Sequence, residues 1–230
     1  MSGFPKTLVL IAACFLVLAN NIHGQGAGAP SFLAPKKALM TVRVHNHAGL
    51  SRSDLNFAEA VATQVFRERG VQILWYDCGP SNHADNDPAC GESLNSNTFD
   101  LRICRSCPPS LTVLGGDVGG YASGQTATVC SRWAEELEQT RYVSSTKVLG
   151  RVIVHELGHL VLSPGHSPVG VMKANWTAGD VDAAKLGMLT FTTEQGELIR
   201  SKLNFLGSAS SETAASAKSS IQGNLPSANK

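Results

Sequence analysis

Apolar residues recur with two different periods in the first part of the chain after residue 37. Across residues 39–47 they alternate with polar residues, which predicts a strand. Behind a cap at Ser51 or Ser53 they recur every three or four residues, which predicts a helix that Gly70 ends. Residues 71–76 predict a second strand. This β-α-β order predicts a parallel pair of strands with a right-handed crossover.

The middle of the chain combines short apolar runs with polar, glycine-rich connections. Residues 99–104 predict a third strand and residues 126–130 a further one. Residues 77–97 are polar and hold two cysteines, so we expect a long loop there. Residues 108–124 are rich in Gly and Pro, which predicts an irregular connection.

Two helices are predicted in the second half of the chain. The first is capped by Ser144 or Ser145 and runs to about Leu162, with apolar positions at helical spacing. The second begins after Thr192, which forms a capping box with Gln195. Together these elements predict an α+β fold, with a twisted mixed sheet, a helix that carries the candidate site and a C-terminal helix.

The ends of the chain differ in composition from the middle. An apolar run follows a single basic residue near the start, so residues 1–24 predict a signal peptide rather than a membrane span. Residues 25–37, rich in Gly, Ala and Pro, predict a linker. Residues 38–206 form the expected folded domain, and the Ser/Ala-rich residues 207–230 predict a disordered tail. We therefore expect a secreted protein, extracellular or periplasmic, without a membrane partner after signal cleavage.

Composition narrows the choice of partners. Of the 230 residues, 43% are hydrophobic, which is enough for a core, while aromatic residues make up 6%. The formal net charge is +1. Neither a basic surface for nucleic acid nor an aromatic surface for base stacking is indicated.

Cysteine usage agrees with export. Without Cys14 of the signal peptide, five cysteines remain, so at least one thiol is left over from any set of intrachain pairs. Disulfide bonds are expected in an oxidising compartment, although the pairing is not readable from the sequence. Cys104 and Cys107 form a lone CxxC, which fits a redox pair, half of a zinc knuckle or structural bonding. Structural bonding is favoured because no second CxxC and no helix start follow.

Residues 152–172 hold the strongest chemical signal, in the string VIVHELGHLVLSPGHSPVGVM. His155 and His159 lie four apart on a predicted helix, so both imidazoles project from one face and can reach one zinc ion. Glu156 follows the first ligand, where a carboxylate can take a proton from zinc-bound water. Two protein ligands are too few for a stable catalytic zinc site, so a third ligand must come from another part of the chain. His166 follows a Pro-Gly turn that can direct it back to the metal.

This constellation resembles the metzincin clan of zinc metallopeptidases, whose pattern is HExxHxxGxxH followed by a methionine in a tight turn beneath the metal. The resemblance covers roughly residues 39–206 and implies that His155, His159 and His166 bind Zn²⁺. It also implies that Glu156 is the general base and that Met172 lies in the turn. The stretch HSPVGVMKANW is also similar to predicted secreted bacterial zinc peptidases. Here the third histidine comes one residue later than in the clan pattern, and Leu162 replaces its glycine.

Acidic residues offer another third ligand. Asp180 or Asp182 could replace His166, as in zincins with an acidic third ligand, and Glu194 and Glu197 are further candidates. The simpler interpretation of all four is solvated charge in a loop or at a helix start.

The function that follows is a secreted zinc endopeptidase, acting as a monomer on a peptide or protein substrate. The substrate would pair with an exposed edge strand within residues 111–130. Two other classes remain open: a catalytically inactive, metzincin-like exported binding module, and a thiol-disulfide protein that uses Cys104 and Cys107.

Overall fold

The computed structural model describes residues 37–79, 88–91, 93–107, 119–162 and 165–222. The predicted signal peptide and all but the last residue of the predicted linker lie outside the described residues. Among the helices of the described part, none is long and apolar enough to cross a membrane.

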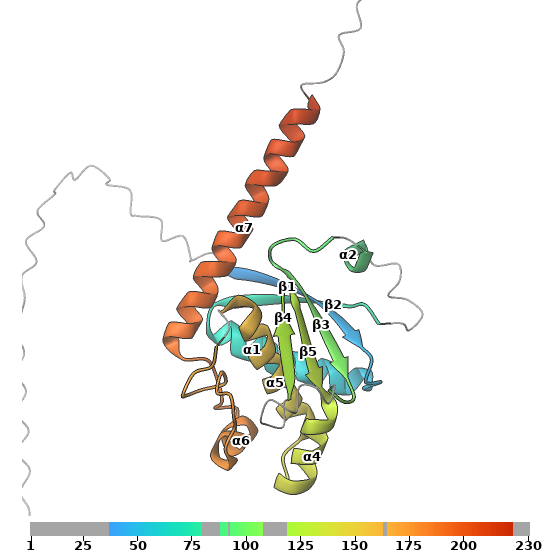
Figure 1. The fold of residues 1–230 in the computed structure, drawn as a ribbon, viewed down its shortest axis with the longest axis vertical. Coiled ribbons are helices and arrows are strands. Elements are labelled where there is room, and N and C mark those ends of the chain that lie inside the picture. Colours follow the sequence, from blue (N-terminus) through green and yellow to red (C-terminus); the bar gives the residue numbers. More distant parts are fainter. Residues whose placement is uncertain (1–36, 80–87, 92, 108–118, 163–164, 223–230) are drawn as a thin grey trace, which may run out of the picture. The chain divides into compact units, whose positions relative to one another are not determined.

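Five strands form one mixed sheet in the order β2-β1-β3-β5-β4 (Figure 1). The strands are β1 (Ala38–Asn46), β2 (Val71–Asp77), β3 (Thr98–Cys104), β4 (Gly120–Ser123) and β5 (Thr126–Cys130). Strands β1, β2, β3 and β5 run parallel, whereas β4 pairs with β5 in the antiparallel direction. The four strands expected from the sequence are confirmed, and the sequence missed β4. The α+β class with a mixed sheet is confirmed.

The β1-α1-β2 unit follows the local signals of its sequence. Helix α1 (Arg52–Glu68) begins behind Ser51, whose side chain accepts a hydrogen bond from the amide of Asp54. Of the two possible caps, the structure therefore uses Ser51. Gly70 has a φ of +75°, which favours glycine, and the chain turns there into β2. Strands β1 and β2 pair in parallel, as the β-α-β pattern predicted.

Helix α5 (Ser145–Val161) lies in the core, in contact with α1, β4 and β5. Its apolar residues share one hydrophobic cluster with the inward-facing residues of the strands and of α1. Figure 1 shows α1 and α5 together on one face of the sheet. This helix matches the expected one at both ends. Helix α4 (Ser131–Arg141), which precedes it, was not expected from the sequence.

Three further helices complete the described part. Helix α2 (Pro88–Gly91) is a single turn within the long segment expected to be a loop. Helix α6 (Ala178–Lys185) was not expected. Helix α7 (Thr193–Gln222) begins with the predicted capping box, because the amide of Thr192 donates to the Gln195 side chain and the amide of Gln195 to the Thr192 hydroxyl.

The C-terminal segment differs from its prediction. A disordered tail was expected over residues 207–230, yet α7 continues as helix to Gln222. The segment is poor in large apolar residues, which suggested disorder, but between Gly207 and Gly223 it contains no Gly or Pro to end a helix. Residues 223–230 lie outside the described part.

Two disulfides join segments that lie far apart in the sequence. Cys78 pairs with Cys90, which closes the segment after β2, and Cys107 pairs with Cys130 at the end of β5. Cys104 is the free cysteine of the described residues. The structural role expected for the CxxC is therefore confirmed for Cys107, whose partner is distant, and a redox pair between Cys104 and Cys107 is not formed.

We predict that Gly150→Ala destabilises the domain. A Cβ at Gly150 would lie 2.7 Å from the Cβ of Val61 and 2.8 Å from the carbonyl oxygen of Ala58, so α1 and α5 would have to separate. Overpacking costs about 1–3 kcal/mol, which exceeds the gain of about 1 kcal/mol in helix propensity. Urea unfolding measures the difference. Gly179→Ala is the control, because its Cβ would contact only the Thr177 hydroxyl at 3.8 Å. Equal stability of the two variants would contradict the prediction.

Candidate metal centre

Helix α5 places the first two histidines of the motif at the edge of the core. His155 is buried at 8% exposure, and His159, one turn later on the same face, is half-buried. The helix ends at Val161, and the backbone of its C-cap, Leu162, is extended. One face of α5 therefore presents two imidazoles next to each other where the helix stops.

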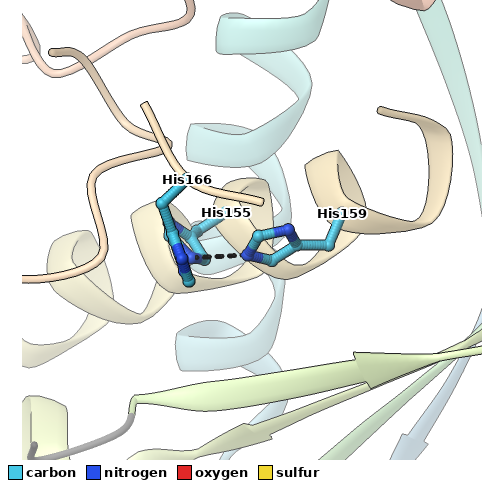
Figure 2. A group of neighbouring side chains, drawn as sticks. All are labelled: His155, His159 and His166. Atoms are coloured by element: carbon cyan, nitrogen blue, oxygen red, sulfur yellow. Dashed lines mark hydrogen bonds between the residues drawn. The ribbon is translucent and has the colours of Figure 1, made fainter. Parts of the chain in front are cut away.

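The chain then turns back and brings His166 to the same place. Gly165 has a φ of +143°, the positive sign that was expected of it, whereas Ser163 and Pro164 of the expected turn lie outside the described residues. His166 itself is exposed. The centroid of its ring lies 5.4 Å from that of His155 and 4.8 Å from that of His159. Figure 2 shows the three rings directed toward one another. One potential ligand atom from each histidine lies within 4.8 Å of the other two.

A backbone carbonyl fixes the orientation of His155. Its Nδ1 lies 2.7 Å from the carbonyl oxygen of Val171. Because a carbonyl oxygen only accepts, Nδ1 carries the proton, and the lone pair of the neutral ring is on Nε2. That Nε2 lies 3.0 Å from Nε2 of His159. Metal-binding histidines in proteins are commonly held through the second ring nitrogen in this way.

Burial favours the neutral, metal-binding form of these histidines. Desolvation lowers the pKa of His155. Desolvation, with smaller contributions from His155 and His166, lowers the pKa of His159 to about 4. Both imidazoles are therefore neutral at pH 7, which is the form that binds a metal.

Glu156 follows His155 on α5 and lies in the core. Its side chain is 4% exposed, and burial raises its pKa to about 8. Its Oε2 atom is buried without a hydrogen-bond partner among the described residues. An unpaired buried carboxyl is costly, and such groups concentrate at functional sites.

Gly120 makes the room that Glu156 occupies. A Cβ at this first residue of β4 would lie 2.7 Å from Cγ and 2.9 Å from Oε1 of Glu156. It would also lie 2.5 Å from the carbonyl oxygen of Thr128. Sequence reasoning did not single out Gly120, although the glycine-rich run before β4 was the available signal.

Met172 lies in a turn packed against the helix that carries the first two histidines. Its side chain is 2% exposed, and its Sδ would lie 2.6 Å from a Cβ placed on Gly158 of α5. The turn is closed by a hydrogen bond from the amide of Ser167 to the carbonyl oxygen of Met172, 2.8 Å long. Met172 thus lies in a turn against α5, and its role as the turn beneath a bound metal stays a prediction.

The four acidic alternatives do not join the three histidines. Within the described residues, three or more potential metal ligands come together in one place, and these are His155, His159 and His166. Asp180 caps α6 through Thr177 and forms an ion pair with Lys173. The other three candidates are exposed; they are Asp182, Glu194 and Glu197.

The three-histidine group fits Zn²⁺. Zinc accepts neutral imidazole nitrogens, prefers four ligands, and in catalytic sites takes three of them from the protein. Three nitrogens converge here, and at least one is fixed by a backbone carbonyl. No carboxylate competes within the group, so hard cations such as Mg²⁺ and Ca²⁺ fit less well.

Comparisons with known proteins find similar solved structures at low sequence identity. No family model matches the chain, and no curated protein matches it. Among solved structures it is similar to archaemetzincin from Methanopyrus kandleri, with 18% identity and a TM-score of 0.47 over 75% of this chain and 99% of that one. It is also similar to a zinc-dependent peptidase from Methanocorpusculum labreanum, with 13% identity and a TM-score of 0.48 over 69% of this chain and 99% of that one.

We predict that Gly158 and Met172 are energetically coupled. Gly158→Ala would force Met172 aside and destabilise the domain by about 1 kcal/mol net, because overpacking outweighs helix propensity. Met172→Ala alone costs about 2–5 kcal/mol through the cavity it leaves. The double variant should lose less than the sum, by about 0.5–3 kcal/mol, since the new methyl occupies vacated space. Urea unfolding of the four proteins gives the coupling energy, and strictly additive losses would contradict it.

Proposed function

We propose that this protein is an exported zinc endopeptidase of metzincin type. In this proposal His155, His159 and His166 hold the ion and Glu156 is the general base. The observation that carries it is the convergence of three imidazoles, together with a buried carboxyl at the residue after His155 that lacks a hydrogen-bond partner among the described residues. Two disulfides support an oxidising compartment, in agreement with the signal peptide expected at the N-terminus.

Zn²⁺ at the triad would polarise a peptide carbonyl and lower the pKa of a water molecule. Glu156 would accept the proton of the attacking water and then pass it to the leaving amine. Its environment suits both steps. Burial raises its pKa to about 8 and so favours the protonated acid that passes a proton to the amine, whereas a cation held by the triad would favour the carboxylate that accepts one.

The sheet offers a place for an extended substrate. Strand β4 ends the strand order and pairs with β5 alone, so within the described residues its outer edge has free backbone groups. A peptide can add to such an edge as a further strand. Because Gly120 at the start of β4 contacts Glu156, a peptide paired there would pass close to the general base. This edge lies within residues 111–130, where the sequence placed substrate binding.

We predict that Glu156→Gln lowers the rate of casein or gelatin hydrolysis by about 10²–10⁴-fold while zinc content stays stoichiometric. The amide keeps the shape of the side chain but cannot accept the proton. Zymography with metal analysis measures both properties. Glu197→Gln, an exposed change on α7, is the matched control and should retain full activity. A zinc-loaded wild type that leaves both substrates intact would instead favour the inactive binding module.

We predict that His166→Ala weakens zinc binding by at least tenfold, because it removes one of three nitrogen ligands. Competition with a chromogenic chelator gives the affinity of the purified proteins. Asp180→Asn is the control and should bind zinc like the wild type, since Asp180 is engaged with Thr177 and Lys173. The reverse order of affinities would transfer the third ligand to Asp180.

A further inference from the structure

Arg151 is a buried cation on the helix that carries the first two histidines. It lies one turn before His155, with 3% exposure, and donates from Nη1 to the carbonyl oxygen of Leu189 over 2.7 Å. Its Nη2 donates to the carbonyl oxygen of Gly187 over 3.0 Å. Both acceptors belong to residues 187–191, the segment between α6 and α7, which we name the strap.

The strap is in turn bonded to the turn that fixes His155. The carbonyl oxygen of Thr190 accepts a hydrogen bond of 2.9 Å from the amide of Val171. The two segments approach closely because Gly170 has no side chain. Its φ is +73°, and a Cβ there would lie 2.7 Å from the carbonyl oxygen of Thr190.

These contacts form a closed series of hydrogen bonds that begins and ends on one face of α5, and we name this series the circuit. Arg151 holds the strap, the strap holds the amide of Val171, and the carbonyl of the same Val171 accepts Nδ1–H of His155. That carbonyl also accepts the indole N–H of Trp176 at 3.3 Å. The carbonyl oxygen that sets the tautomer of His155 is therefore located by contacts from two directions.

We propose that Arg151 is a positioning residue of the metal centre. By holding the strap against α5, it places the Val171 carbonyl that keeps Nε2 of His155 unprotonated and directed at the ion. This inference rests on the proposed zinc site.

Stability alone is a weak reason for a cation at this position. Among the described residues no carboxylate forms an ion pair with Arg151, and its Nε is buried without a hydrogen-bond partner. Burial lowers the pKa of its guanidinium, yet arginine stays charged in proteins. An apolar side chain of similar volume would avoid that desolvation cost. The planar fork of arginine, however, bonds two carbonyls of one segment, which fixes that segment in two directions.

A second arginine, Arg69, also binds the strap but links it to α1 rather than to α5. Arg69, at the end of α1, donates from Nε to the carbonyl oxygen of Phe191 over 3.1 Å, at the far end of the strap. It ties the strap to α1, which carries no ligand of the triad. Of these two arginines, Arg151 is the one that links the strap to α5, the helix that bears His155 and His159.

The test compares Arg151→Met and Arg151→Lys with Leu149→Ala, a buried change on α5 that should lower stability without touching the circuit. Zinc affinity is measured by chelator competition at a temperature where all variants are folded. The tautomer of His155 is read from ¹⁵N NMR of the zinc-free proteins.

We expect Arg151→Met to weaken zinc binding by about 10–100-fold, as loss of an outer-shell partner does. We also expect it to lower the population protonated on Nδ1 of His155. Arg151→Lys, with one donor group left, should give values between those of Arg151→Met and the wild type. Leu149→Ala should match the wild type in zinc affinity and in the tautomer of His155.

Two outcomes would overturn the inference. One is wild-type zinc affinity together with an unchanged His155 tautomer in both Arg151 variants. The other is the same loss of affinity in Leu149→Ala, which would assign Arg151 to stability alone. If Arg151→Met does not fold, the lysine variant decides by the same two measurements. Failure of the wild type to bind zinc would refute the proposed function, while the tautomer measurement would still test the role of Arg151.

Discussion

The hydrogen bond between Nδ1 of His155 and the carbonyl oxygen of Val171 is the contact on which the candidate site depends. It determines which nitrogen of His155 has a free lone pair and in which direction that lone pair points. Without it, the ring could rotate or change tautomer, and the meeting of three imidazoles would no longer define one position for an ion. The turn that contains Val171 and Met172 is therefore part of the candidate site, to which it contributes a backbone carbonyl.

Close packing against α5, β4 and the turn is the second constraint, and three glycines permit it. Gly158 lets Met172 pack against α5, Gly120 gives space to the Glu156 side chain, and Gly170 lets the turn lie against the strap. At each position a Cβ would come closer than 3 Å to its neighbour. A site that must hold a ligand geometry within fractions of an ångström is here enclosed by groups packed directly against the backbone at these glycines.

The sequence by itself determined the elements whose signals are local. Alternating and helical periods located β1, α1, β2 and α5, and Thr192 with Gln195 marked the start of α7. The spacing of His155 and His159 placed both on one helix face, because the period of an α-helix is fixed by its backbone. The same local logic failed for β4, which has four residues and begins with a glycine, and for the tail, where composition indicated disorder but no helix breaker was present.

Only the tertiary structure decided which distant groups meet. The contact of Glu156 with Gly120 and the bonds of Arg151 to the strap join residues that share no local pattern. The pairing of Cys107 with Cys130 is of the same kind. A periodicity reports which face of an element is buried, but not what it is buried against. Local signals therefore marked the candidate ligands and base, whereas packing of the turn, the strap and β4 around α5 determined how they are held.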